Sequence, residues 1–195
     1  IIKRPVPPLG KMFKWKIRKM FHDIKKYQPP RVPCHVDIGD ARNMPFEDNF
    51  FDFVITSPPY LNKIEYTSIY KIELSLFFDI PETKLRSYIG ERVNEQNLPE
   101  YQDIPEIAKA YFNDMKLVLA ELYRVCKEAA KLAVVIGGGC FPDRVVEADK
   151  IFSELAERSG FEVEKILVCR QSWCTRARTI KVGKMRESVV ILKKA

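Results

Sequence analysis

The sequence predicts an α/β fold with a partly parallel sheet and an antiparallel hairpin at its C-terminal end. Three observations support this. Four apolar or β-branched residues, 53–56, run directly into a Ser-Pro-Pro-Tyr tetrapeptide, which is typical of a buried strand, here 52–56, that meets a turn. Apolar residues recur at helical spacing over 106–128. Two further predicted strands, 161–170 and 187–193, close the chain with no helix between them, which favours an antiparallel pair.

The composition is that of a folded protein without a membrane span. With 195 residues, of which 46% are hydrophobic, we expect a sizeable core. No apolar stretch is long enough for a transmembrane helix, and the N-terminus lacks the pattern of a signal peptide. The five cysteines are scattered, with no Cys-x-x-Cys pair. We therefore expect a reduced, cytoplasmic chain with no disulfide framework and no metal site.

The net charge of +7 is unevenly distributed. Residues 1–33 hold ten Lys and Arg against one acid, and residues 162–195 hold nine against three, so the middle of the chain is acidic. Two basic ends around an acidic body suggest a polyanionic partner that binds one side. Basic ends that are simply solvated remain an equal alternative.

The first 33 residues form an arm and a helix that precede the main domain, 34–195. Prolines and a glycine make residues 1–10 irregular. From Lys11 to Tyr27, apolar residues recur at helical spacing among lysines and arginines, which predicts an amphipathic basic helix. We expect its apolar stripe to pack on the rest of the chain.

A short strand, 35–38, is expected next, followed by Gly39-Asp40-Ala41 and then by the strand at 52–56. If the two strands are parallel, Asp40 and Ser57 follow them at the same edge of the sheet, where ligands of α/β folds bind. An aspartate in an ordinary turn is the alternative for Asp40.

The tetrapeptide after the second strand combines hydrogen-bond acceptors with a flat ring. Neither Pro58 nor Pro59 can donate a ladder hydrogen bond, so we expect the carbonyls of Ser57 and Pro58 to remain free. Tyr60 places an aromatic face beside them. This arrangement suits a planar group with an amino edge, although a structural turn in which Tyr60 only packs is the alternative.

The middle of the chain is predicted to be helix, loop, helix and strand. Apolar spacing favours a helix over 61–78, and 79–105 lacks periodicity. Long loops are often functional, and Arg86 and Arg92 in this one suit nucleic acid, although an ordinary surface loop fits as well. After the helix at 106–128, a buried strand at 131–136 leads into three glycines. We interpret these glycines as a strand-end loop that needs close backbone approach, not as a dinucleotide fingerprint.

The last third is predicted to be a helix over 145–158, which ends near Gly160, and two strands. The segment between these strands, 172–186, is expected to be a basic loop. Its residues Trp173, Arg176 and Arg178 are candidates for contact with the backbone of a nucleic acid.

Together, Gly39-Asp40-Ala41 and Thr56-Ser57-Pro58-Pro59-Tyr60 resemble the motifs of the S-adenosylmethionine-dependent DNA amino-methyltransferases. In that family the serine form of the tetrapeptide is typical of cytosine-N4 enzymes, and the aspartate form is typical of adenine-N6 enzymes. The resemblance covers roughly residues 34–195. It implies a Rossmann-like class I methyltransferase sheet whose last strands form an antiparallel hairpin.

The resemblance also implies roles for individual residues. Asp40, Ala41 and Thr56 would lie at the cofactor, S-adenosylmethionine. Ser57 and the Pro58 carbonyl would accept hydrogen bonds from the amine, with Pro59 shaping the segment, and Tyr60 would stack on a base flipped out of DNA. An enzyme of a restriction-modification system is the implied context.

The chain departs from the family because a glycine-rich cofactor loop of Phe-x-Gly-x-Gly type is absent. We therefore expect a C-terminal part of a methyltransferase domain that lacks the first strands. A preceding segment or a second chain would complete the cofactor site. Two other hypotheses are an RNA base amino-methyltransferase and a non-catalytic nucleic-acid-binding module.

Overall fold

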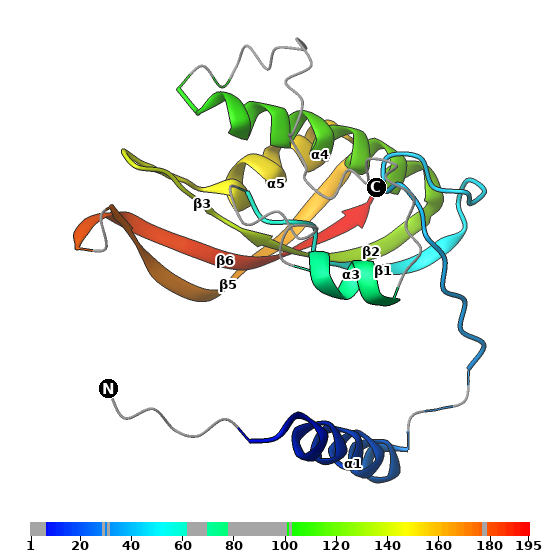
Figure 1. Cartoon of the computed structure of the whole chain (residues 1–195). Helices are drawn as coiled ribbons and strands as arrows, with labels where there is room; N and C mark the ends of the chain where they lie inside the picture. The colour runs from blue at the N-terminus through cyan, green and yellow to red at the C-terminus, as the bar shows by residue number, and fades with distance from the viewer. Residues whose placement is uncertain are drawn as a thin grey trace. The chain divides into compact units, whose positions relative to one another are not determined.

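A computed structural model describes residues 7–28, 30, 32–61, 70–77, 101, 103–176 and 179–195 of the chain. The chain divides into two compact units, Ile1–Ile38 and Gly39–Ala195 (Figure 1). None of the described helices is long and apolar enough to cross a membrane.

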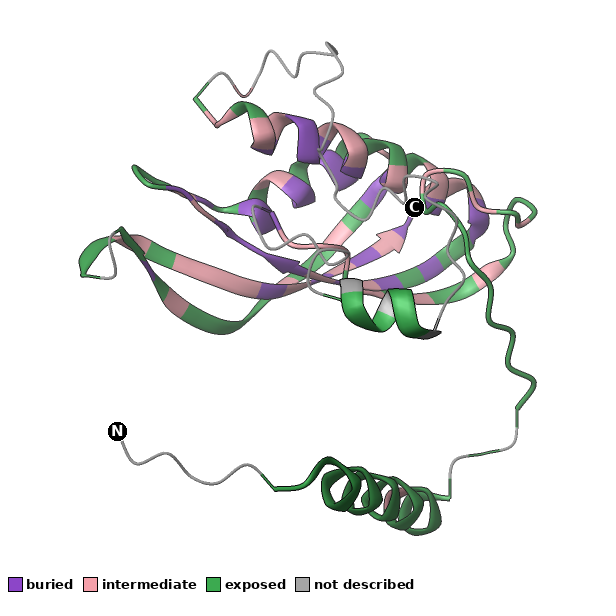
Figure 2. Cartoon of the chain, in the orientation of Figure 1, coloured by how far each residue is buried: buried purple, intermediate pink, exposed green. Residues whose placement is uncertain are grey.

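The first unit contains one helix, α1 (Leu9–Tyr27), which confirms the helix predicted there. It begins after Pro8 and ends at Gln28, a residue with a left-handed φ of 40° whose N–H donates to the carbonyl of Ile24. No residue of α1 is buried (Figure 2). The packing expected for its apolar stripe stays a prediction.

The strand predicted at 35–38 is absent. Val36 and Ile38 are 86% and 96% exposed, and the segment makes no β-ladder. The physical reason is that a strand needs a hydrogen-bonding neighbour. Among the described residues none pairs with this segment, so a sequence of high β-propensity stays unpaired here.

The second unit alternates strands and helices in the order that the sequence predicts. The expected helix at 61–78 is described only in part, as α3, because residues 62–69 and 78 lie outside the described residues, as does most of the predicted loop 79–105. The elements are β1 (Phe51–Thr56), α3 (Lys71–Phe77), α4 (Glu106–Val125), β2 (Cys126–Gly137), β3 (Gly139–Cys140), β4 (Val145–Val146), α5 (Ala148–Arg158), β5 (Phe161–Arg176) and β6 (Ile180–Lys194).

Four strands form the main sheet, in the order β1-β2-β6-β5. β1 and β2 are parallel, whereas β6 pairs antiparallel with both β2 and β5. The predicted mixture of parallel strands and a terminal antiparallel hairpin is therefore confirmed. Strands β3 and β4 form a separate small hairpin.

Helices α4 and α5 cover one face of this sheet, and the core lies between them and the strands (Figures 1 and 2). β2 alternates toward the core with a period of two, so that Leu132, Val134 and Ile136 are buried. Phe112 of α4 and Phe152 of α5 are fully buried against the sheet. Burial of such aromatic side chains contributes about 1.5–3 kcal/mol each, which makes this layer the main source of stability.

The edge strand β1 has an uncovered face. Phe53 and Ile55 are 54% and 73% exposed, although Val54 between them packs against the core. Sheets of α/β proteins usually have both faces covered. The expectation that further sheet and helices complete this edge is consistent with that exposure and stays a prediction.

The basic loop predicted at 172–186 is instead an extension of the terminal hairpin. β5 and β6 stay paired as far as Arg176 and Ile180. The segment Ser172 to Thr175 contains β-formers and no proline, so cross-strand pairing continues where the charge pattern favoured a loop. A disulfide between Cys140 and Cys174, with a Cα–Cα distance of 5.5 Å, links β5 to β3 and contradicts the expected fully reduced chain.

The loop before β1 is fastened to α4 by charged side chains. The backbone N–H of Met44 donates to Glu121 over 2.7 Å, and Arg124 donates to the carbonyls of Met44 and Phe46. Arg124 also pairs with Glu121 over 2.6 Å and with Asp48 over 2.7 Å. These contacts determine where the chain enters β1.

Substitution of Glu121 by Gln should weaken the dependence of stability on pH. Hydrogen bonds from Arg124 and from the Met44 N–H lower the pKa of Glu121 to about 2. A lowered folded-state pKa stabilises the protein above the ordinary value, and that contribution is lost as the pH falls toward 2. We expect Glu121→Gln to lower the free energy of unfolding by about 1–3 kcal/mol at pH 7 and by less at pH 3. Urea denaturation at both pH values measures this, with Glu157→Gln on the exposed side of α5 as control. An equal loss at both pH values would contradict the expectation.

Candidate active site

The Ser-Pro-Pro-Tyr segment leaves the carboxyl end of β1, next to β2. Thr56, the last residue of β1, is in register with Val134, so β2 continues beyond β1 toward Gly137. Ser57 is exposed and Tyr60 is half-buried, whereas Leu61 is 1% exposed and belongs to the core. Leu61 therefore anchors a segment whose polar end stays accessible.

The glycines after β2 make room for this segment, as the sequence predicts. A Cβ on Gly137 would lie 2.5 Å from the ring of Tyr60, and one on Gly139 would lie 2.7 Å from the side chain of Leu61. Both distances are shorter than real carbon contacts allow. Only glycine at these positions permits Tyr60 and Leu61 to lie on the strand end.

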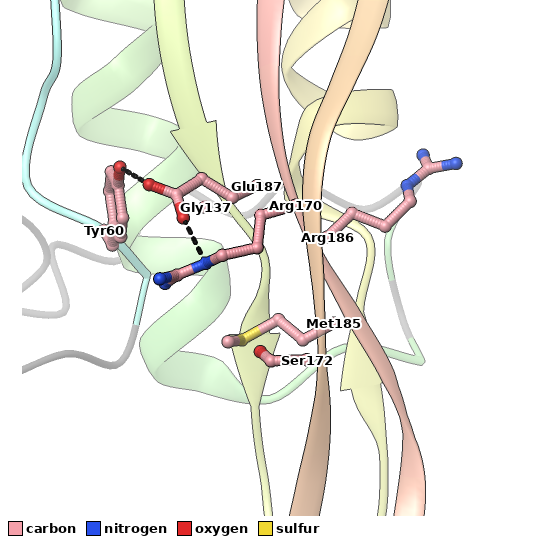
Figure 3. Close-up of a pocket in the computed structure, with 7 residues that line it drawn as sticks. All are labelled: Tyr60, Gly137, Arg170, Ser172, Met185, Arg186 and Glu187. Carbon is pink, nitrogen blue, oxygen red and sulfur yellow. Dashed lines mark hydrogen bonds and ion pairs between the residues drawn. The ribbon is translucent and has the colours of Figure 1, made fainter.

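Beyond Tyr60, one row of residues crosses three strands. Gly137 of β2 is in register with Glu187 of β6, which is in register with Arg170 of β5. The Tyr60 hydroxyl donates to one oxygen of Glu187 over 2.6 Å, and Arg170 Nε donates to the other over 3.0 Å (Figure 3). We call Gly137, Glu187 and Arg170 the transverse row. Tyr60 lies on its first member and bonds to its second.

A small open pocket lies at this row. Its lining is mixed, with a tyrosine ring, a carboxylate and two arginines. The residues are Tyr60, Gly137, Arg170, Ser172, Met185, Arg186 and Glu187 (Figure 3). Its position at the carboxyl ends of the parallel strands β1 and β2 is the ligand-binding edge of an α/β sheet.

Asp149 fixes the strand on both sides of Glu187. Its carboxylate, which is 3% exposed, accepts hydrogen bonds from Arg186 Nη2 over 2.9 Å and from Ser188 Oγ over 2.6 Å. Burial by itself raises the pKa of Asp149, but the hydrogen bonds from Arg186 and Ser188 outweigh it and lower the pKa. Because side chains alternate along a strand, this attachment to α5 leaves Glu187 on the opposite face, toward Tyr60.

A second tyrosine, Tyr111, is buried close enough to Tyr60 to be affected by it electrostatically. Tyr111 of α4 is 2% exposed, and its hydroxyl has no hydrogen-bond partner in the described part of the chain. Burial, and to a smaller extent the neighbouring Tyr60, raise the pKa of Tyr111 far above its ordinary value. Tyr111 therefore stays neutral within the core cluster to which Leu61 also belongs.

Asp40 lies in a turn and not at the end of a strand, contrary to the expectation. It forms an isolated bridge with Asn43, and its carboxylate accepts from the backbone N–H of Arg42 over 2.9 Å and from Arg42 Nη2 over 2.6 Å. Arg42 also contacts Asp114 of α4 over 3.3 Å, and Tyr111 lies one helical turn before Asp114. The two sequence motifs thus meet the same half of α4. Ala41 is exposed in the turn.

Only some of the residues predicted to contact nucleic acid are among the described residues. Arg86, Arg92 and Arg178 lie outside the described residues. Trp173 is 51% exposed near the tip of the hairpin, where Lys181 Nζ and Lys184 Nζ lie 4.5 Å and 5.5 Å from its ring centroid. Arg176 ends β5 and is exposed. Neither lysine could be identified from local sequence, because their place beside Trp173 depends on the pairing of the two strands.

Sequence comparison finds relatives among methyltransferases. The chain is 32% identical over 160 residues to the type II methyltransferase M.AvaI of Nostoc sp., an alignment that covers 63% of this chain and 33% of that protein. It is 26% identical over 204 residues to the type II methyltransferase M.BsoBI of Geobacillus stearothermophilus, over 76% of this chain and 40% of that protein. The chain thus spans between a third and two fifths of the length of these curated relatives. No family model matches.

Comparison with solved structures supports the fold. A Thermus thermophilus protein described as a DNA modification methylase, in complex with S-adenosyl-L-methionine, matches with a TM-score of 0.50 and 16% identity. The match covers 80% of this chain and 54% of that one. The predicted class I methyltransferase fold is therefore confirmed for the part of the sheet described above.

Substitution of Gly137 by Ala should displace Tyr60, because the new methyl group would overlap its ring. We expect Gly137→Ala to destabilise the protein by about 1–3 kcal/mol through this overlap. In a Tyr60→Ala background the obstruction is gone, so the same change should cost less than half as much. Thermal denaturation of the four proteins measures the cycle. Gly10→Ala, where no atom lies within 4 Å of the new Cβ, is the control. Equal costs in both backgrounds would show that Tyr60 does not occupy the space above Gly137.

Proposed function

We propose that this chain, which is related by sequence to the type II methyltransferases, carries the amine-binding half of a DNA methyltransferase. The reaction is S-adenosylmethionine-dependent transfer of a methyl group to an exocyclic amino group of a base, cytosine N4. One observation supports this most directly. Tyr60 follows the exposed Ser57 at the ligand edge of the sheet, and its ring is held there by Gly137 and Glu187.

Such a segment suits the activation of an aromatic amine. The lone pair of an exocyclic amine is delocalised into the base, so the nitrogen is a poor nucleophile. Acceptors at Ser57 and at the Pro58 carbonyl would bind the two amine protons and favour a tetrahedral nitrogen, which localises the lone pair. Acceptors that are already in place act most strongly on the transition state, in which positive charge develops on that nitrogen.

Tyr60 supplies the surface for the base. Taking a base out of the duplex costs a few kcal/mol, and stacking on an aromatic ring recovers part of this cost. One face of the Tyr60 ring lies on Gly137. A flipped base would stack on the opposite face of the ring, next to the acceptors of Ser57 and Pro58.

The described residues fit one end of the cofactor. The Asp40 side chain is 50% exposed, so its carboxylate is accessible to the amino group of an adenine, which would replace part of the contact that Arg42 makes with both of its oxygens. Ala41 is exposed in the same turn, and Thr56 ends β1. When bound, S-adenosylmethionine would supply the methyl group from its sulfonium and leave as a neutral thioether, and the methylated amine would release one proton to solvent. The rest of its binding site we assign to a preceding segment or a second chain.

The terminal hairpin is suited to the DNA backbone. Lys181 and Lys184 gather around Trp173 near its tip, and Arg176 lies at the turn. Lysine and arginine side chains that contact phosphates supply most of the affinity for DNA. The hairpin extends from the same strands that carry Arg170 and Glu187, so it would hold DNA beside Tyr60.

The choice of base and the biological context rest on the tetrapeptide and on the relatives. A serine at its first position favours cytosine N4 over adenine N6. Both curated relatives are named type II methyltransferases, which supports a role in restriction-modification. A non-catalytic DNA-binding module is the second candidate, because Arg42 already binds the Asp40 carboxylate and would compete with a cofactor.

Methyl transfer from labelled S-adenosylmethionine tests this proposal. The chain and the complete polypeptide that its gene encodes are each incubated with unmodified duplex DNA and with transfer RNA, and the products are analysed as nucleosides. We expect N4-methylcytosine in DNA. N6-methyladenine would correct the base, label in transfer RNA would favour an RNA enzyme, and transfer to neither substrate would favour the binding module.

Replacement of Tyr60 by Ala should abolish most methyl transfer while the fold remains. Loss of a base–aromatic stack costs about 1–3 kcal/mol, so we expect the rate to fall roughly 5- to 150-fold. Circular dichroism checks the fold, and Tyr27→Ala on α1, which is exposed, is the matched control. Unchanged methyl transfer would rule out a base-stacking role for Tyr60.

Removal of the two tip lysines should weaken DNA binding uniformly across sequences. We expect Lys181→Gln/Lys184→Gln to reduce the slope of log affinity against log salt by about two. Fluorescence anisotropy with duplex DNA at several salt concentrations measures the slope. Lys116→Gln/Lys150→Gln on the helices α4 and α5 removes the same charge elsewhere. An equal effect of both pairs would mean that only net charge matters.

A further inference from the structure

From the transverse row we infer that Glu187 is a positioning residue for methyl transfer: it holds the Tyr60 ring in the orientation that receives the base. The inference rests on the proposed function, because it gives Tyr60 the stacking role. It adds a residue that neither the sequence motifs nor the comparisons identify. Its basis is the contact of Glu187 with Tyr60 on one side and with Arg170 on the other.

The geometry of the transverse row brings the Tyr60 ring to Glu187. Directly paired residues on neighbouring strands share a face of the sheet. Gly137 has no side chain, so the Tyr60 ring lies over its position and reaches across to the next strand. There the hydroxyl meets Glu187 at 2.6 Å, the short distance of a charge-assisted hydrogen bond. Glu187 is therefore the group that fixes the outer end of the ring.

Glu187 is itself held in place, by Arg170 and by the attachment of its strand to α5. Its other carboxylate oxygen accepts from Arg170 Nε over 3.0 Å. Its neighbours in sequence, Arg186 and Ser188, bind the buried Asp149 of α5. The Glu187 side chain is 28% exposed, so it is partly shielded from water. A strand attached to a helix on one face thus presents a fixed acceptor on the other face.

The hydrogen bond between Tyr60 and Glu187 restricts the orientation of the Tyr60 ring. The tetrapeptide restricts the backbone of Tyr60, but a tyrosine retains two side-chain torsions. The Gly137 contact limits one face of the ring, and the Glu187 hydrogen bond limits its tilt. Stacking and amine activation depend on one arrangement of base and acceptors, so small errors in the tilt lower the rate. A carboxylate on the hydroxyl also makes the ring more electron-rich. Such a ring better stabilises the positive charge that develops on the stacked base in the transition state.

Kinetics in the complete polypeptide test the inference. We expect Glu187→Ala to lower kcat for DNA methylation about tenfold or more, with KM for DNA changed by no more than about twofold. Tyr60→Phe removes only the hydroxyl and should give a similar loss. The double variant should be no slower than either single variant, because all three proteins lack the same hydrogen bond. Glu187→Gln, whose amide oxygen still accepts, should retain most of kcat.

A second measurement does not depend on activity. In protein with ¹³C-labelled tyrosine, the order parameter of the Tyr60 ring should fall in Glu187→Ala and stay near the wild-type value in Glu187→Gln. Glu162→Ala, which removes a carboxylate from the same hairpin, is the control for both measurements.

The outcomes separate this inference from the proposed function. Additive losses in the double variant, or an unchanged order parameter of the Tyr60 ring in Glu187→Ala, would overturn the positioning role. If the wild-type polypeptide transfers no methyl group to DNA, the proposed function fails. The ring measurement still decides in that case whether Glu187 orients Tyr60.

Discussion

Gly137 has no side chain, and the ring of Tyr60 occupies the space that one would fill. This contact joins two parts of the chain that are far apart in sequence, the end of β1 and the end of β2. It requires the parallel register of these strands, because a shift that brought Ile136 to the place of Gly137 would put a side chain under the ring. Leu61, next in the chain, depends on Gly139 in the same way. The position of the whole Ser-Pro-Pro-Tyr segment follows from two glycines.

The buried charge of Asp149 has a related effect on the far side of the site. An ion pair in the core contributes little net stability, because desolvation offsets most of the attraction. Its geometry is nevertheless specific: Arg186 and Ser188 both reach one carboxylate, and so the relation of β6 to α5 is defined. The residue between them, Glu187, is then directed at Tyr60. Packing on one face of the sheet thus determines a polar contact on the other.

Charge and exposure divide the second unit into functional regions. The face of the sheet under α4 and α5 is mostly apolar, and the polar pair of Asp149 and Ser188 is buried within it. The carboxyl edge of β1 and β2 carries acceptors and an aromatic ring, and the hairpin beyond it carries lysines around a tryptophan. The exposed face of β1 is where the structure is open, at Phe53 and Ile55. The edge proposed to bind an amine thus lies beside a sheet face that the described residues leave exposed, which agrees with the proposal that another segment completes the site.

Local patterns in the sequence were enough to predict the helices α1, α4 and α5, the strand before the tetrapeptide, and the glycines that need close approach. These features depend on periodicity, on proline and on the absence of a Cβ, which act within a few residues. The patterns wrongly predicted a strand at 35–38, where the apolar residues have no pairing strand among the described residues. They also wrongly predicted a loop at 172–186, where strand pairing continues despite the basic composition. They also missed Glu187, Arg170 and the two tip lysines. Those residues acquire their neighbours only through the register of β2, β6 and β5, and through the disulfide and buried carboxylate that hold the hairpin. The sequence by itself therefore determined which segment is the candidate for binding an amine. Only the tertiary structure decided what holds that segment in place, because a contact such as that of Tyr60 with Glu187, 127 positions apart, leaves no local signal in the sequence.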